Sequence, residues 1–125
     1  MSLDLAKVAA LAAMEKTDEP TLLLDVQKIL SITDYFVITS AKNSRQVKAI
    51  VDEVNKKVKL AGSLPPRQVE GLGELEWVLL DYGIFVVHVF SNEARSLYGL
   101  ERLWEDAEQV DITHQEIPIA TTASG

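Results

Sequence analysis

Two strand-forming segments of the chain are separated by a single glycine. Residues 76–82 (EWVLLDY) and 84–90 (IFVVHVF) are rich in β-branched, aromatic and other apolar residues, and Gly83 lies between them. A chain that reverses over so short a link must make a tight turn, so these segments predict an antiparallel β-hairpin.

Other segments show the three-to-four-residue apolar spacing of amphipathic helices or the composition of strands. The expected helices are 3–14, 44–61 and 92–107, and the expected further strands are 21–26, 34–40 and 67–70. The strands at 21–26 and 34–40 are close enough to form an antiparallel pair. Asn43 or Ser44 is the expected N-cap of the second helix, and Asn92 that of the last. Gly99 predicts a kink or a division into two short helices in the last helical segment.

The 125 residues suit one folded domain. The element order predicts an α/β (α+β) fold in which a mixed sheet is flanked by helices. Beyond Asp111 the periodic pattern is lost, Pro118 interrupts the chain, and the last five residues are small and polar. We expect the domain to span residues 1–110 and residues 111–125 to form a flexible C-terminal tail.

Charge is distributed unevenly along the chain, whose net charge is −7. Residues 1–67 carry ten basic and eight acidic groups, whereas residues 68–125 carry two basic and eleven acidic groups, a net of −9. This balance disfavours a protein that coats nucleic acid, because such binding needs clustered positive charge. The acidic half either seeks a basic partner or is simply a solvated surface.

The composition also restricts the location and the chemistry of the protein. Cysteine is absent, which excludes disulfides and thiolate metal sites. No apolar run approaches the about 20 residues of a membrane span, and the first residues do not look like a signal sequence. We therefore expect a soluble, cytoplasmic protein without a membrane partner.

Few residues suggest catalysis. His88, on a strand with Val86 and Phe90 on the same face, and His114 in the tail have no metal-ligand spacing, so no metal site is expected. Asp34 and Asp81 would be the acids of a two-metal nucleotidyltransferase, but the alternating acid pair after a Gly-Ser turn is missing. No cofactor is expected, and we predict that the protein is not an enzyme.

The aromatic residues of the acidic half are more suggestive. Trp77, Tyr82, Phe90, Tyr98 and Trp104 all lie between positions 77 and 104. Core packing explains most such residues, while aromatic anchors next to acidic neighbours are also typical of a protein-binding surface. Both interpretations remain open at this point.

An ordered set of short motifs extends over most of the chain, from about residue 3 to residue 110. The motifs are DYFVI at 34–38, Ser44 with RQV at 45–47 and Ala49-Ile50, Glu70-Gly71, WVLLDYG at 77–83, VHVF at 87–90, and Arg95 with Tyr98, Leu100-Glu101, Leu103-Trp104 and Asp106-Ala107. In this order they resemble the Iojap family of ribosomal silencing factors. The resemblance implies a mixed five-stranded sheet, similar to the nucleotidyltransferase fold but without the catalytic acids.

The resemblance also implies a function. Members bind the large ribosomal subunit through its protein number fourteen, block joining of the small subunit, and repress translation when nutrients are scarce. A homodimer is implied for the free protein. The contact residues carried over to this chain are Trp77, Leu79, Leu80, Asp81, Tyr82, His88, Phe90, Arg95, Tyr98 and Trp104.

Two alternatives to silencing stay open, namely a large-subunit assembly factor and a divergent nucleotidyltransferase. The outward face of the helix at 44–61 is expected to be basic. It carries Lys48, Lys56, Lys57 and Lys59, joined by Lys42 and Arg45. This face would lie near ribosomal RNA or pair with the acidic half of a second copy.

Overall fold

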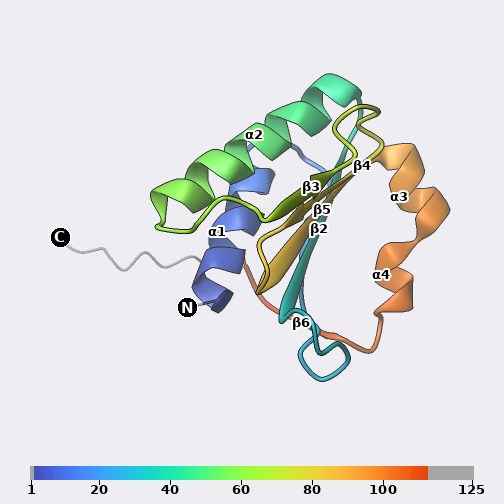
Figure 1. Ribbon diagram of the computed structural model, residues 1–125. Coiled ribbons are helices and arrows are strands. Elements are labelled where there is room, and N and C mark those ends of the chain that lie inside the picture. The colour runs from blue at the N-terminus through green and yellow to red at the C-terminus, as the bar shows by residue number, and fades with distance from the viewer. Residues whose placement is uncertain (1, 113–125) are drawn as a thin grey trace, which may run out of the picture.

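A mixed sheet with helices on both faces forms the fold in the computed structural model, which describes residues 2–112 (Figure 1). The strands are β1 (Leu22–Asp25), β2 (Tyr35–Ala41), β3 (Gln68–Glu70), β4 (Trp77–Asp81), β5 (Phe85–Ser91) and β6 (Glu108–Gln109). The helices are α1 (Ser2–Met14), α2 (Ser44–Leu60), α3 (Asn92–Tyr98) and α4 (Leu100–Leu103). The predicted fold class is confirmed, with six strands in place of five.

The strand order is β3-β4-β5-β2-β1-β6. The predicted antiparallel pairs β1–β2 and β4–β5 are both present, and β4 turns into β5 across Gly83, whose φ of 91° favours glycine. The central strands β2 and β5 run parallel, from Tyr35 opposite Phe85 to Ala41 opposite Ser91. The connection between these two parallel strands contains α2, β3 and β4.

Helices α1 and α2 cover one face of the sheet. Alternate residues of the strands, including Val37, Val87 and Leu80, point to this face and are fully buried. The alanines of α1 allow that helix to approach closely, while α2 contributes a valine and isoleucine stripe. The stripe is Val47, Ile50, Val51, Val54 and Val58. Asn43 caps α2, as one of the two expected caps, because its side chain accepts a hydrogen bond from the Gln46 amide.

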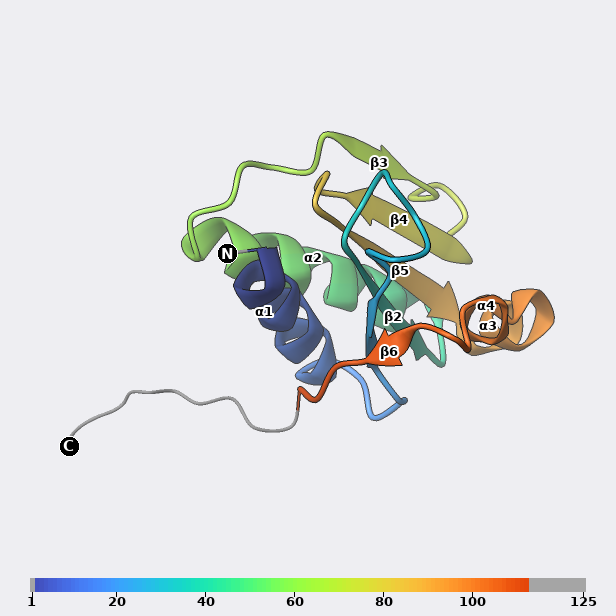
Figure 2. The same ribbon diagram turned by 90° about the horizontal axis from the view of Figure 1, so that it is seen from below.

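Helices α3 and α4 lie against the other face (Figure 2). Here Phe36, Ile38 and Phe90 pack with Ala94 of α3 and Leu100 of α4. The two short helices cover less of the sheet than α1 and α2 do on the opposite face (Figures 1 and 2). The β4 end of this face is therefore partly exposed, as the intermediate burial of Trp77 and Leu79 shows.

Three details differ from the sequence-based expectation or lie beyond it. Ser91, and not Asn92, caps α3, because the Ser91 hydroxyl accepts a hydrogen bond from the Ala94 amide. Strand β6 was not expected: it is two residues long and depends on pairing with β1. Ile112 is buried in the core beside α1 and α2, so packing continues past the expected boundary at residue 110.

Gly99 has a φ of 55° and divides the last helical segment into α3 and α4, which confirms one of the two expected forms. Residues 113–125, with His114 and most of the expected tail, lie outside the described residues. In the part of the chain that the structure describes, no helix combines the length and the apolar character needed to cross a bilayer.

Candidate functional site

Trp77 opens β4 and is held by contacts from two neighbouring elements. Its indole N–H donates a hydrogen bond to Nδ1 of His88 on β5, at 3.1 Å. Its ring lies 4.8 Å from the ring of Phe90 and 4.9 Å from that of Tyr98, measured between centroids. The indole is thereby fixed in one orientation while part of its surface stays accessible.

Two depressions flank Trp77 on this face. One has a volume of about 320 Å³ and is lined by Leu79, Glu70 and Gly71 as well as Trp77. The other, of about 360 Å³, extends to Leu97 and Tyr98 of α3, whose side chains are 75% and 54% exposed. We call the accessible parts of Trp77, Leu79, Leu97 and Tyr98 the Trp77 surface.

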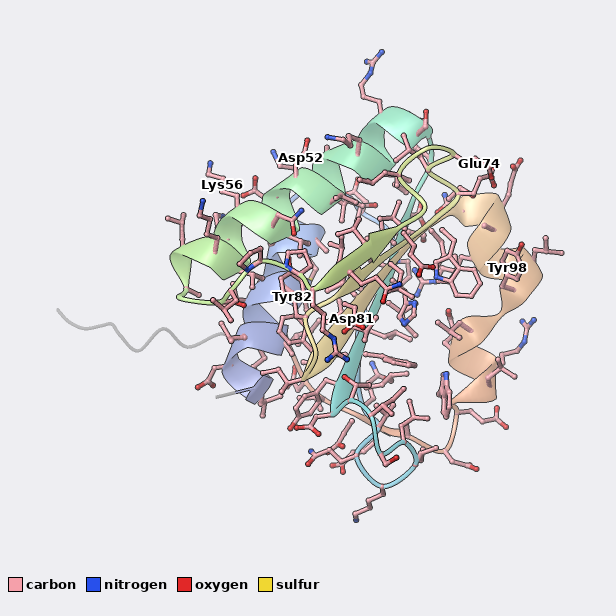
Figure 3. All side chains as sticks on the ribbon, viewed as in Figure 1. Asp52, Lys56, Glu74, Asp81, Tyr82 and Tyr98 are labelled. Atoms are coloured by element: carbon pink, nitrogen blue, oxygen red, sulfur yellow. The ribbon has the colours of Figure 1, made fainter. Side chains whose placement is uncertain are left out.

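The rim of the Trp77 surface is acidic. Glu70 borders the first depression, and three glutamates border the second. These three are Glu74, Glu76 and Glu93. Figure 3 shows Glu74 and Tyr98 on the same side of the molecule, whereas Lys56 projects from the opposite side. An apolar centre with a charged rim is the usual anatomy of a protein-binding surface.

The expected contact residues divide between the two faces of the sheet. Trp77, Leu79 and Tyr98 come together on the Trp77 surface. Phe90 is fully buried and His88 is only 5% exposed, so both lie beneath Trp77 and support it. Burial lowers the pKa of His88 to about 4, which keeps the imidazole neutral and able to accept the indole hydrogen bond.

Leu80 and Tyr82 face the side covered by α1 and α2. Leu80 is fully buried there, which rules out direct contact with a partner in this fold. Tyr82 stacks on Phe85, and its hydroxyl donates to the side-chain oxygen of Asn55 on α2. Burial raises the pKa of Tyr82 to about 12, as expected for a phenol removed from water. The period-two alternation of a strand produces this division.

Asp81 and Arg95 are both engaged within the chain. An oxygen of Asp81 accepts the Gly83 amide at 2.7 Å and lies 3.4 Å from Nε of Arg67. Arg95 has a side chain only 11% exposed and donates to the Pro20 carbonyl, the Ser40 hydroxyl and the Glu101 carboxylate. The Arg95 guanidinium therefore joins α3 to α4 and to the sheet, an internal role that the expectation of a partner contact did not include.

Trp104 follows α4 and packs edge-to-face on Phe36, with centroids 5.7 Å apart. It belongs to the cluster that covers the sheet and lies apart from the two depressions beside Trp77. Conversely, Leu97 and the rim glutamates were not among the expected site residues. The glutamates at positions 74 and 76, within three residues of Trp77, are the signal in the sequence for an acidic rim.

The described residues do not assemble a catalytic acid pair. Asp34 precedes β2 and Asp81 ends β4, with β5 between these strands, so the backbones lie about 10 Å apart across the sheet. Within residues 2–112, no group of three His, Asp or Glu side chains is arranged to hold a metal ion. The geometry on the Trp77 surface suits binding.

Comparisons with known proteins show the family and the fold of the chain. Residues 1–124 match the family model described as "Ribosomal silencing factor during starvation". A ribosomal silencing factor RsfS from Bacillus subtilis is 41% identical over 106 residues, which cover 85% of this chain and 89% of that protein. A crystal structure of a protein from Chromobacterium violaceum superposes with a TM-score of 0.75 at 30% identity, covering 99% of this chain and 96% of the other.

A mouse protein named for mitochondrial assembly of the ribosomal large subunit is also similar. It is 35% identical over 83 residues, which cover 65% of this chain and 36% of the mouse protein.

Proposed function

Because the chain belongs to the family of ribosomal silencing factors, we propose that it binds the large ribosomal subunit and blocks joining of the small subunit. The contact is made with the large-subunit protein number fourteen, and the protein acts in the cytoplasm when nutrients are scarce. The Trp77 surface carries this proposal, because it offers exposed apolar and aromatic side chains within an acidic rim.

The proposed mechanism is occlusion and needs no covalent step. Apolar burial at Trp77, Leu79, Leu97 and Tyr98 supplies affinity, and the acidic rim favours a basic protein over the phosphates that surround it. A protein that occupies the docking site of the small subunit prevents joining by its bulk alone.

Co-sedimentation with isolated large subunits tests the docking surface. Leu97→Ser removes a side chain that is 75% exposed, so the fold is retained while about tenfold in affinity is lost. The matched control is Leu60→Ser on α2, where the leucine is 74% exposed on the opposite side of the sheet and binding is expected to be unchanged. Equal binding by both variants would contradict the assignment of the surface.

Subunit joining tests the outcome of binding. Added protein should reduce the yield of joined ribosomes from purified subunits, and Leu97→Ser should need about ten times more protein for the same effect. Normal joining on large subunits saturated with the wild-type protein would contradict silencing.

Assembly of the large subunit is the second candidate function, and the similarity to the mouse protein named for that process supports it. It would use the same surface on an immature particle. Cells that lack the protein would then accumulate immature large subunits during rapid growth, whereas a silencing defect would appear as excess joined ribosomes under starvation.

The proposal includes a peripheral contact with ribosomal RNA at the start of α2. Lys42 and Arg45 are exposed there, and Arg45 lines a depression together with Leu75 of the loop between β3 and β4. The neighbouring Glu74 of that loop borders the Trp77 surface. A particle bound to the Trp77 surface would therefore meet the positive charge of Lys42 and Arg45 at the edge of the contact, and this charge attracts phosphates.

The free protein is proposed to form a homodimer. The exposed Leu97, Tyr98 and Leu103 of α3 and α4 support this, since a second copy would remove them from water. Light scattering of the purified protein, with and without Leu97→Ser, measures the mass in solution and tests the pairing.

A further inference from the structure

The depression between α3 and the start of β4 combines apolar walls with a ring of carboxylates. Leu97 and the rings of Trp77 and Tyr98 form the walls, and Glu74, Glu76 and Glu93 form the ring. We call it the acidic groove. With a volume of about 360 Å³ it has room for one long side chain of a partner protein.

The carboxylates of the acidic groove lack a positive counterpart. Among the described residues, none of the three makes an ion pair, and Glu76 has only a long contact of 3.4 Å with the Ser91 hydroxyl. Three like charges around one depression repel one another and create a negative potential inside it. A cation that enters the groove would relieve this repulsion.

The apolar walls specify what kind of cation fits. A free metal ion would gain nothing from Leu97 and Tyr98, whereas a long basic side chain can lay its methylenes on these walls. A planar guanidinium can also stack flat on an aromatic ring while its fork of N–H donors bonds the carboxylates, whereas an ammonium can bridge two carboxylates but cannot stack in this way.

We propose that the acidic groove receives an arginine side chain of the protein on which the chain docks. This inference rests on the proposed docking function and adds to it the residue class that the partner must present. The guanidinium of this arginine lies among Glu74, Glu76 and Glu93, and its methylenes lie on Leu97 and Tyr98. The net charge of −9 over residues 68–125 favours a basic partner at this end of the molecule.

The first test measures binding to isolated large subunits over a series of salt concentrations. Glu74→Gln combined with Glu93→Gln keeps the shape of the groove and removes two charges, so affinity should fall about tenfold and depend less on salt. The matched control is Glu105→Gln combined with Asp106→Asn, two exposed acids beyond α4, which should bind as wild type does. If the groove variant binds as tightly as wild type, the inference is overturned while the docking function stands.

The second test uses small probes and does not depend on the ribosome. N-acetyl-arginine methylamide should shift the indole N–H resonance of Trp77 at millimolar concentration, the lysine analogue should shift it less, and the norleucine analogue should leave it unchanged. The resonance of Trp104, which lies outside the groove, is the internal reference. No arginine-dependent shift at Trp77 would overturn the inference even if wild type binds large subunits.

A second copy of the chain is the competing occupant. If the Glu74 and Glu93 variant alters the dimer mass measured by light scattering while large-subunit binding is unchanged, the groove serves pairing and the inference is wrong. If wild type fails to bind large subunits but the arginine probe still shifts Trp77, the groove is confirmed as an arginine site and the proposed docking function fails instead.

Discussion

The hydrogen bond between Trp77 and His88 fixes the protonation of the imidazole. An indole nitrogen only donates, so Nδ1 of His88 must be the acceptor and the ring proton sits on Nε2. Nε2 is buried and, in the part of the chain that the structure describes, has no hydrogen-bond partner. The ring meets Phe36 edge-to-face at 4.7 Å, an arrangement in which the positive edge faces the negative ring face. Protonation of Nδ1 would abolish the contact that orients Trp77.

His88 should therefore make stability depend on pH in a defined window. Its pKa is about 4 in the folded protein and about 6.5 in the unfolded chain. Between these two values the unfolded state binds a proton that the folded state does not, which favours unfolding. The resulting loss of unfolding free energy is about 2 kcal/mol at pH 5 and levels off below the folded pKa. Urea unfolding at pH 7.5 and pH 5 measures it.

The control for this titration is His88→Asn, which retains an acceptor for the indole but does not titrate in this range. The fall in stability between pH 7.5 and pH 5 should be about 2 kcal/mol smaller in the variant than in wild type. Equal falls in both proteins would show that His88 is not the group responsible.

Arg95 should contribute to stability and not to partner binding. Arg95→Met leaves the Pro20 carbonyl, the Ser40 hydroxyl and the Glu101 carboxylate without their donor, at a cost of about 2 kcal/mol. Thermal unfolding should register this loss, while large-subunit affinity below the melting temperature should stay within about twofold of wild type. Arg102→Met, on the exposed side of α4, is the matched control and should change neither.

At the scale of elements, local composition predicted most of the sheet. The hairpin around Gly83 and the pairing of β1 with β2 follow from short links between strand-forming segments, and both were confirmed. Short links between segments predict neither the parallel pairing of β2 with β5 nor the short strand β6. Both depend on contacts between distant parts of the chain, which leave no local periodicity.

The candidate site was predictable in part for the same reason. Alternation along β4 separates Trp77 and Leu79 from Leu80 and Tyr82, but which face stays open depends on the short reach of α3 and α4. The internal role of Arg95 was hidden as well, because two of its partners come from Pro20 and Ser40, far away in the sequence.

The loop between β3 and β4 should control the position of Trp77. Gly71 has a φ of 91°, and a Cβ placed there would lie 2.0 Å from the backbone oxygen of Trp77. Gly71→Ala must therefore displace the start of β4, which should cost about 2 kcal/mol or more and weaken binding to large subunits. Gly73→Ala in the same loop is the control, because its Cβ would meet nothing within 4 Å and the stability should change by less than about 0.5 kcal/mol. Equal unfolding curves for the two variants would contradict this account.

At the scale of the whole molecule, the two faces of the sheet divide the charge. The Trp77 surface with its acidic rim lies on the side of α3, and the exposed lysines of α2 lie on the other side (Figure 3). Lys57 is neutralised by Glu15 and Glu53, and Lys48 by Asp52. Positive charge without an ion pair in the described structure therefore remains at both ends of α2, at Lys42 and Arg45 and at Lys56 and Lys59.

Only the N-terminal end of α2 adjoins the Trp77 surface, because Arg45 shares a depression with Leu75, whose neighbour Glu74 borders that surface. Only this end should therefore contribute to an RNA contact. Lys42→Gln combined with Arg45→Gln should weaken large-subunit binding and make the plot of log affinity against log salt less steep by about 1.5, as expected for two lost phosphate contacts. Lys56→Gln combined with Lys59→Gln changes the net charge equally at the far end of α2 and should leave the slope unchanged. Equal slopes for the two double variants would mean that net charge alone governs the salt dependence. If Lys42→Gln combined with Arg45→Gln changes only the mass of the dimer, the start of α2 pairs with the acidic half of a second copy.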